Sequence, residues 1–335
     1  MENPKEYTFS VVVPVYNRPD EIDELLQSLR QQTYKQFEII IVEDGSKNGC
    51  HEVVKKYEKQ LNIKYYYKEN TGPGTTRNYG AERAHGDYLV FFDSDCIIPE
   101  KYFEIVNKAL NKNKLDAFGG PDMAHESFTV IQKAISYSMT SFLTTGGIRG
   151  SKKSMEKFHP RSFNMGYTQE VFEATEGFST MRFGEDIDMS IRIVKKGFST
   201  GLIKEAGVFH KRRTDFRKFF KQVHNSGIAR INLFKRHPES LKIVHTFPAI
   251  FTIGSSLCLI LGFFNWLFLA PLLLYAILIF LDSLRQNKHL LVAIFSIAAS
   301  YIQLFSYGLG FIRAVWKRII KKDKEFHAFR KNFYK

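Results

Sequence analysis

Carboxylate side chains follow apolar stretches of this sequence at positions where they could bind a cation or accept a proton. The triplet Asp93-Ser94-Asp95 comes directly after the apolar run 88–92. If the extended backbone continues, alternation places both carboxylates on the same side, at a spacing suited to a hard cation such as Mg²⁺ or Mn²⁺. A triplet of this kind that stands alone is more often a solvated turn, so its interpretation depends on the residues that accompany it.

Other polar residues could complete a site for an anionic ligand. Asp44 ends a second apolar run and could accept hydrogen bonds from the base of a nucleotide. Arg77 and Asn78, at the start of a predicted helix, could contact anionic or hydroxyl groups. Gly72 and Gly74 would let the backbone approach a ligand, although a Gly-Pro-Gly turn on its own is usually only a turn.

A second group of acids lies at the start of a predicted helix in residues 184–197. Glu185, Asp186 and Asp188 fall in its first turn, basic residues fall in its last turn, and Gly197 follows it. Acids at a helix N-terminus complement the helix dipole, and a glycine ends a helix readily. This pattern explains why acids occur there but does not give them a catalytic role.

The elements that must position these residues alternate between strand-like and helix-like patterns. Buried strands are predicted at 9–15, 37–42, 63–67 and 88–92, and helices from Pro19 and over 51–61 and 75–84. This alternation is typical of an α/β fold with a mostly parallel sheet and crossover helices. Ligands of open parallel sheets bind beyond the carboxyl ends of the strands. We therefore expect the polar segments 16–17, 43–46, 70–74 and 93–95 to face one crevice.

The positive charge of the chain is concentrated in two stretches. The 335 residues include 48 Lys and Arg, 34 Asp and Glu, and three cysteines without metal-site spacing. Nine basic residues and one acid lie between 211 and 236, and nine basic residues and two acids lie between 313 and 335. These stretches bracket segments 247–281 and 290–312, which contain no charged side chain. Basic flanks around apolar segments favour an anionic lipid membrane over nucleic acid as the partner.

The apolar region is too long for one membrane span. Thirty-five residues would form a helix of roughly 52 Å, whereas the hydrocarbon core is about 30 Å thick. We predict membrane segments at about 246–264, 266–282 and 290–312, with a buried helical domain as the alternative. Three full crossings would place one basic flank outside, against the positive-inside tendency, so a segment that is re-entrant or lies in the interface is a further alternative.

The predicted organisation has four parts. Residues 1–212 form a catalytic domain, 213–245 a basic amphipathic juxtamembrane segment, 246–312 the membrane segments and 313–335 a basic tail. The sequence MENPKEYTF has no apolar run of the kind that signal peptides contain. We therefore expect a catalytic domain in the cytoplasm, attached to the inner (cytoplasmic) membrane by a multi-pass or re-entrant region.

Six motifs, in order and with the right spacing, resemble the inverting glycosyltransferases of family 2. They are VVVPVYNRP (11–19), IIIVEDGS (39–46), TGPGTTRNYG (71–80), YLVFFDSD (88–95), FNMGYTQEVFEATEGF (163–178) and GEDIDMSIRIVKKGF (184–198). The resemblance implies the GT-A nucleotide-sugar fold, a Rossmann-like mostly parallel sheet with flanking helices. Segments 216–240 and 306–311 are similar to membrane-tailed members that build extracellular polysaccharides.

The resemblance also implies roles for individual residues. Asp44 would contact the base, Asp93 the ribose or the water shell of the metal, Asp95 a divalent Mn²⁺ or Mg²⁺, and Asp186 would be the catalytic base. His210 lies roughly where some relatives place a third metal ligand, with a structural histidine as the alternative. The implied donor-binding set comprises Pro14, Tyr16, Asn17, Glu43, Asp44, Arg77, Asn78, Asp93, Ser94 and Asp95.

The reaction makes the same chemical demands. A hydroxyl group is a poor nucleophile and a diphosphate is a charged leaving group, so one carboxylate must accept a proton and a cation must neutralise charge. We therefore expect transfer of one sugar from a nucleotide-diphosphate sugar, with UDP favoured, to a polyprenyl-phosphate-linked or glycan acceptor. A processive enzyme of the family would carry a Gln-x-x-Arg-Trp motif, which is absent from residues 222–230.

Three other classes of protein are alternatives to a glycosyltransferase. A nucleotidyltransferase would have a glycine-rich triphosphate loop after the first strand, where this chain has residues 14–17 without glycine. A dinucleotide-dependent oxidoreductase would show GxGxxG there. A non-catalytic membrane protein that binds nucleotide sugars remains the main alternative, although all four expected carboxylates are present.

Overall fold

The computed structural model describes residues 4–123, 125, 128–145, 159–211 and 213–326, which form two compact units. The first unit contains residues 4–125 and 159–211, and the second contains 128–145 and 213–326. Residues 128–145 fall within the predicted catalytic domain 1–212, but the structure groups them with the C-terminal helices. Residues 327–335 of the predicted basic tail lie outside the described part of the chain.

The first unit is built on a seven-stranded sheet with the order β3-β2-β1-β4-β8-β6-β9. Its parallel half confirms the predicted α/β fold and consists of β1 (Phe9–Val15), β2 (Phe37–Asp44), β3 (Ile63–Lys68) and β4 (Tyr88–Phe91). Beyond β4 lie β8 (Met165–Thr168), antiparallel to β4 and to β6 (Ala117–Gly119), and then β9 (Thr200–Leu202), parallel to β6.

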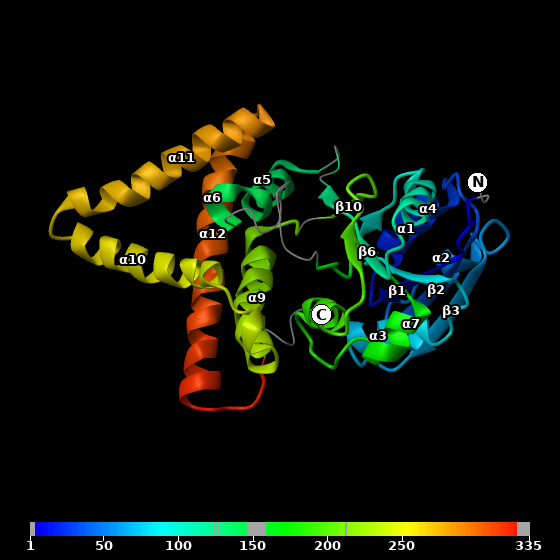
Figure 1. Ribbon diagram of the computed structural model, residues 1–335. Coiled ribbons are helices and arrows are strands. Elements are labelled where there is room, and N and C mark those ends of the chain that lie inside the picture. The colour runs from blue at the N-terminus through cyan, green and yellow to red at the C-terminus, as the bar shows by residue number, and fades with distance from the viewer. Residues whose placement is uncertain (1–3, 124, 126–127, 146–158, 212, 327–335) are drawn as a thin grey trace. The chain divides into compact units, whose positions relative to one another are not determined.

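Helices cover both faces of this sheet (Figure 1). They are α1 (Pro19–Arg30), α2 (His51–Lys55), α3 (Pro73–Ala81), α4 (Tyr102–Lys112), α7 (Gln169–Thr175) and α8 (Glu185–Lys195). Alternate residues of β1 enter different cores, because side chains of a strand point to opposite faces. Val11 and Val13 pack against Leu25 and Leu26 of α1, whereas Val12 belongs to the core on the α8 side.

A small second sheet lies beside the main one and has the order β5-β10-β7. Strand β10 (Val208–His210) is antiparallel to β5 (Cys96–Ile97) and parallel to β7 (Asp122–Met123). Its register pairs His210 with Cys96, which follows the Asp93-Ser94-Asp95 triplet directly. A residue more than a hundred positions from the triplet is thereby brought beside it.

The second unit is helical. It consists of α5 (Val130–Thr140), α6 (Phe142–Thr145), α9 (Phe216–Arg236), η1 (Pro238–Ser240), η2 (Ile243–Thr246), α10 (Phe247–Gly262), η3 (Trp266–Leu269), α11 (Ala270–Asn287), α12 (Leu290–Ala314) and the π-helical η4 (Val315–Ile320). Helix α5 belongs to this unit because Ile135 and Met139 share an apolar core with Phe219 of α9 and Ala299 of α12.

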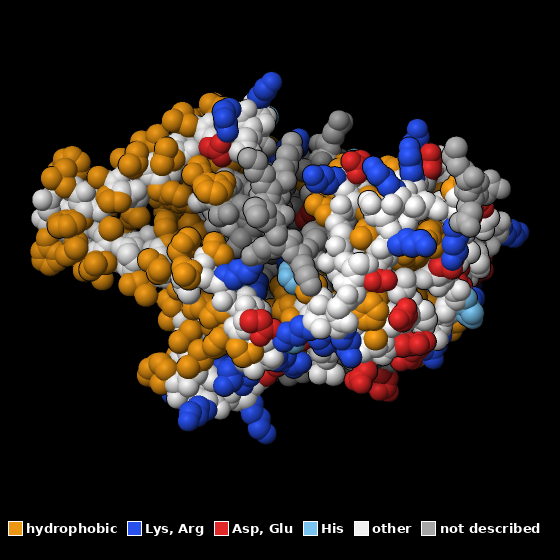
Figure 2. Space-filling model, in the orientation of Figure 1, with side chains coloured by type: hydrophobic (Ala, Val, Ile, Leu, Met, Phe, Trp, Pro, Cys, Tyr) orange, Lys and Arg blue, Asp and Glu red, His pale blue; other side chains and the backbone are white. Residues whose placement is uncertain are grey.

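Three helical segments among the described residues are long and apolar enough to cross a membrane. They are Ile243–Gly262, Trp266–Asn287 and Leu290–Ile320, and they coincide with the three predicted segments to within a few residues at most ends. Apolar side chains cover the hairpin of α10 and α11, as Figure 2 shows. The chain therefore has a large apolar surface of the kind that soluble monomers rarely expose.

Candidate active site

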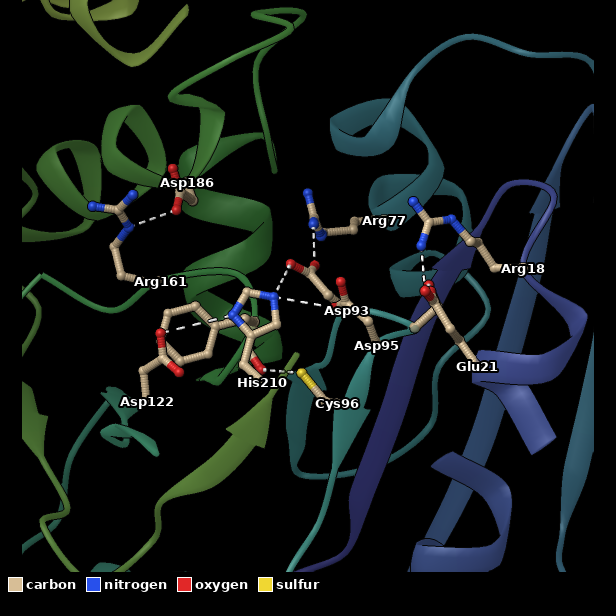
Figure 3. Close-up of polar contacts among 12 residues, drawn as sticks. Arg18, Glu21, Arg77, Asp93, Asp95, Cys96, Asp122, Arg161, Asp186 and His210 are labelled. Carbon is tan, nitrogen blue, oxygen red and sulfur yellow. Dashed lines mark hydrogen bonds and ion pairs between the residues drawn. The ribbon is translucent and has the colours of Figure 1, made fainter. Parts of the chain in front are cut away.

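The ends of the parallel strands bring the predicted polar segments to one edge of the sheet. Strands β2, β1 and β4 are neighbours and run in the same direction, so Asp44, Asn17 and Asp93 all follow the same sheet edge. Residues from α3, α8 and β10 join them at this edge, as the close-up shows in part (Figure 3). Residues of the predicted polar segments therefore meet at one sheet edge within the first unit.

Asp44 is buried, and its carboxylate holds the glycine loop after β3. The Thr71 N–H donates to Oδ1 at 2.9 Å and the Gly72 N–H donates to Oδ2 at 3.0 Å, while Lys68 forms an ion pair with Oδ1 at 2.5 Å. Gly72 has φ +100°, a conformation that residues with a Cβ rarely adopt. Asp44 thus fixes the position of the loop that leads into α3.

Glu43 and Asn17 also organise the loops at this edge. The buried carboxylate of Glu43 accepts hydrogen bonds from the Cys50 N–H at 2.8 Å and from the hydroxyl of Ser46. Asn17 has φ 53°, and its side-chain oxygen accepts hydrogen bonds from the N–H groups of residues 47 and 48 at 2.8 and 2.9 Å. Pro14 and Tyr16 are half-buried at the end of β1.

The Asp93-Ser94-Asp95 triplet forms an acidic pair beside a histidine. The Nε2 atom of His210 lies 3.1 Å from Oδ1 of Asp95 and 3.9 Å from Oδ2 of Asp93. Ser94 takes no part in this cluster, because its hydroxyl donates to Glu21 at 3.3 Å. The two acids predicted to act together therefore do lie together, and His210 joins them.

Two further groups orient His210. Its ring stacks on Phe163, with ring centroids 5.0 Å apart, and its Nδ1 lies 3.8 Å from a carboxylate oxygen of Asp122 on the neighbouring strand β7. Burial alone would lower the pKa of His210, but Asp95 and Asp122 raise it to about 10. The surrounding carboxylates therefore favour the protonated form of this imidazole.

This cluster also has the composition of a divalent metal site. Among the described residues, ligand atoms of Asp95, Cys96 and His210 lie within 4.8 Å of one another. Burial raises the pKa of the Cys96 thiol well above its usual range, and the thiol donates to a backbone carbonyl at 3.5 Å, so it is a poor ligand for a hard cation. The remaining donors, carboxylates with one imidazole, suit Mn²⁺, whereas Mg²⁺ prefers oxygen ligands throughout.

Arg77 links this cluster to the acids of α8. Its side chain is only 4% exposed, and its guanidinium forms ion pairs with Asp93 Oδ1 at 2.6 Å and with Glu185 Oε1 at 3.0 Å. The guanidinium also lies over the ring of Phe178, 5.4 Å from its centroid. The arginine predicted to meet a ligand's anionic groups is therefore occupied by two carboxylates of the protein.

Asn78 makes a second connection between the same segments. Its amide group donates to the Phe178 carbonyl and accepts from the Phe178 N–H, both at 2.8 Å. Both polar ends of the side chain are therefore used to hold α3 against the segment that leads into α8. Asn78 therefore has a structural contact here, and its contact with the donor stays a prediction.

Asp186 is buried and forms an ion pair with Arg161. The Arg161 Nε–H donates to Oδ2 at 2.7 Å, and the Ile187 N–H donates to Oδ1 at 2.8 Å. Burial would raise the pKa of Asp186, but Arg161 and then Arg77 hold it below its usual value. These contacts favour the ionised form of the Asp186 carboxylate.

The neighbouring Glu185 has the opposite electrostatic behaviour. Burial raises its pKa to about 7, and the adjacent charge of Asp186 adds to the shift, while Arg77 opposes it. Sequence reasoning placed Glu185 in the first turn of the helix but gave it no role. Arg161 was missed altogether, because nothing in the sequence marks a single arginine 25 positions before the acid that it contacts.

The Arg77 bridge makes a prediction about stability. Arg77→Met should lower the free energy of unfolding by about 3–5 kcal/mol, because it leaves a buried carboxylate without its partner. Adding Glu185→Gln should restore part of this loss, because the buried charge is then removed as well. Chemical unfolding followed by far-ultraviolet circular dichroism measures the free energy of unfolding of both variants. Equal stabilities of the single and double variants would show that the bridge carries no coupling energy.

Comparisons with known proteins agree with this geometry. The family model described as "Glycosyl transferase family 2" matches residues 10–175. A glycosyltransferase of Rickettsia conorii is 31% identical over 198 residues, which is 58% of this chain and 32% of that protein. The poly(ribitol-phosphate) beta-N-acetylglucosaminyltransferase TarS of Staphylococcus aureus is 41% identical over 94 residues, 27% of this chain and 16% of that protein. The chain spans about a third of the length of the curated relatives that head the comparison.

A solved structure extends the similarity beyond the matched domain. The mannosyltransferase PcManGT of Pyrobaculum calidifontis, solved with GDP-Man and Mn²⁺, has a TM-score of 0.62 and 16% identity, and the match covers 89% of this chain and 87% of that one. At this identity the likeness concerns the fold. The matched domain, the glycosyltransferase relatives and the sheet topology together support the assignment of this chain to the family 2 glycosyltransferases with the GT-A fold.

Proposed function

We propose that this protein is a membrane-attached, metal-dependent, inverting glycosyltransferase. It moves one sugar from a nucleotide-diphosphate sugar to a hydroxyl group of a lipid-linked saccharide in the synthesis of a cell-surface polysaccharide. The observation that carries the proposal is the Arg77 bridge, which brings the Asp93/Asp95/His210 cluster and the Glu185-Asp186 pair to opposite sides of one guanidinium. Such a reaction needs these two groups of residues close together.

The donor half of the site is assigned to the acidic cluster and the loops beside it. Asp95 and His210, with Asp93 near them, would hold Mn²⁺ or Mg²⁺, and such a cation neutralises the charge that develops on a departing diphosphate. The loop held by Asp44 presents the backbone near Gly72 to the nucleotide, so we assign the base to this end. Of two similar proteins, PcManGT was solved with GDP-Man, and TarS is named as an N-acetylglucosaminyltransferase.

The acceptor half of the site is assigned to Asp186. Its ionised carboxylate would remove the proton from the attacking hydroxyl group, and Arg161 would keep that carboxylate ionised until the acceptor arrives. One base acting on one displacement inverts the anomeric configuration, because no covalent sugar intermediate intervenes. Glu185 is engaged by Arg77 and is assigned to positioning the pair.

The acceptor and the location follow from the second unit. Apolar helices that are long enough to enter a bilayer, together with basic flanks, favour attachment to an anionic cytoplasmic membrane. A polyprenyl-phosphate-linked saccharide would be presented at such a surface. The S. aureus relative is named for transfer to poly(ribitol-phosphate), a cell-surface polymer, which supports a glycan acceptor of this class.

The proposed activity can be measured directly. Protein purified in detergent, given Mn²⁺, a panel of nucleotide sugars and a lipid-linked saccharide, should release nucleoside diphosphate and form a glycosylated lipid. Asp186→Asn should lower turnover by about 10²–10⁴-fold, because it removes the general base but keeps the shape. Its affinity for the nucleotide should stay within a few-fold. Turnover that Asp186→Asn leaves unchanged would remove this residue from the mechanism.

The metal assignment makes a separate prediction. Asp95→Asn should abolish the increase in nucleoside-diphosphate affinity that Mn²⁺ produces, because a neutral amide is a weak cation ligand. Calorimetric titration with and without EDTA measures this difference. Asp116→Asn, which changes a partly exposed acid that accepts hydrogen bonds from Ser199 in the same unit, is the control. Nucleotide affinity that depends on neither Mn²⁺ nor Asp95 would exclude this metal site.

The Arg161–Asp186 ion pair predicts a change in pH dependence. The rate should fall at low pH as Asp186 becomes protonated, and Arg161 lowers the pKa at which this occurs. Arg161→Gln should therefore raise the pKa of Asp186 and move the acidic limb of the kcat/KM profile to higher pH. Arg83→Gln, which removes an arginine stacked on Tyr79, is the control and should leave that limb in place. A shift to lower pH in Arg161→Gln would contradict the assigned electrostatic role.

A further inference from the structure

Helix α9 runs alongside α12 in the same direction for nearly the whole length of α12. Four contacts join α9 to α12 or to the chain just beyond it, and their residue numbers rise along both segments. They pair Phe216 with Phe295, Gly227 with Tyr307, Asn232 with Arg318, and Arg236 with Glu325. The two helices approach so closely at Gly227 that a Cβ there would lie 2.3 Å from the Tyr307 carbonyl oxygen. Figure 1 shows the pair side by side. Both helices must therefore have the same orientation to any membrane.

The composition of α9 is unsuited to the hydrocarbon core. Its 21 residues include six Lys and Arg and no acid. Lys221 and Arg230 lie in the part that packs along α12, together with His224, Asn225 and Asn232. Charged side chains are costly at the centre of a bilayer. If α12 crossed the bilayer, α9 would have to carry these side chains into it.

The connectivity gives an independent argument. If α9 and α12 both crossed the membrane in the same direction, the chain between them would have to return to the side on which α9 began. That return requires an odd number of crossings, but only α10 and α11 lie between them, and they form a hairpin. A hairpin that crosses twice returns the chain to the side of the membrane that it left. Helices α9 and α12 can then point in the same direction only if neither of them crosses the membrane.

The hairpin of α10 and α11 differs from α12 in its contacts. It runs across α12 rather than along it (Figure 1). Near its base it contacts α12 through Thr252 beside Gly308 and through the hydrogen bond between Ser283 and Ser296 at 2.8 Å, and farther along it the Tyr301 hydroxyl donates to the Leu272 carbonyl. The tip is fully exposed, with Phe263 at 91% and Phe264 at 83%. Helices of 16 and 18 residues span about 24 and 27 Å, close to the thickness of the hydrocarbon core.

Both ends of the hairpin are polar and return to the same helical layer. Helix α11 ends near Asp282, which accepts a hydrogen bond from the Tyr137 hydroxyl of α5 at 2.7 Å. The chain before α10 passes through Lys242 and His245 in η2. Helix α12 itself is apolar and exposed along one stripe, including Leu291, Leu309 and Ile312, whereas α5 and α9 cover other parts of it. One exposed apolar stripe is typical of a helix that lies in the membrane interface.

We propose that the membrane partner of this surface is an anionic lipid bilayer into which only the α10–α11 hairpin inserts. Helices α9 and α12 lie in the plane of the cytoplasmic face, and residue 324 is on the same side as the catalytic unit. This inference rests on the membrane attachment proposed above and adds its topology. It places both basic stretches, around 211–236 and 313–326, on the side where positive charge is favoured.

Side-specific cysteine labelling tests this topology in the full-length protein. Cys50 and Cys96 are buried, so Cys258→Ser provides a background in which an exposed engineered cysteine dominates the labelling. Lys324→Cys reports the chain after α12, and Lys59→Cys is the matched control in the catalytic unit; both positions are exposed. The probe is a membrane-impermeant maleimide added to sealed inner-membrane vesicles of a bacterial host, either inverted or right-side-out.

Both cysteines should be labelled in inverted vesicles and lose their labelling in right-side-out vesicles. Opposite accessibility of the Lys324→Cys and Lys59→Cys positions would show that α12 crosses the bilayer and would overturn the proposal. Extraction with alkaline carbonate tests membrane insertion separately from the proposed transferase activity. Protein that remains in the pellet supports hairpin insertion, whereas complete release would contradict membrane insertion itself while leaving the proposed transferase activity to its own assay.

Discussion

The buried guanidinium of Arg77 is the interaction on which the site depends. A charged side chain removed from water costs several kcal/mol unless its hydrogen-bonding groups are paired, and here two carboxylates pair with it. Those carboxylates come from the segment after β4 and from the first turn of α8, which are about ninety positions apart in the sequence. The ion pairs therefore fix the distance between the Asp93/Asp95/His210 cluster and the Glu185-Asp186 pair, and the double contact of Asn78 with Phe178 holds α3 against the segment that leads into α8.

The same arrangement separates two adjacent acids. Glu185 and Asp186 are both buried, but burial raises the pKa of Glu185 to about 7, whereas Arg161 holds the pKa of Asp186 below its usual value. Two carboxyl groups whose surroundings move their pKa values apart can take different roles in one reaction. Asp186 is the ionised member of the pair. Its partner Arg161 is more than a third exposed, so an incoming group can displace it. This difference supports Asp186, rather than its neighbour, as the base.

The sequence was sufficient for those parts of the structure that depend on local patterns. The apolar runs predicted the parallel strands, and the rule for strand ends predicted that residues 44 and 93–95 meet at one edge. It was insufficient where long-range pairing decides the outcome. Arg77 is an ordinary helical arginine in the sequence, and only the fold shows that carboxylates occupy it. Helix α5 belongs to the second unit because Ile135 and Met139 pack with residues of α9 and α12. No local pattern of apolar residues predicts these contacts.

The chain passes three times between the first unit and the helical second unit. The chain leaves the first unit after β7 and again after β10, two paired strands that carry Asp122 and His210. It re-enters before Arg161, the partner of Asp186. Each of the three connections therefore lies within a few residues of a side chain that orients the metal cluster or the base. If the second unit enters a bilayer as proposed, these are the positions at which the membrane attachment and the candidate site share a covalent connection.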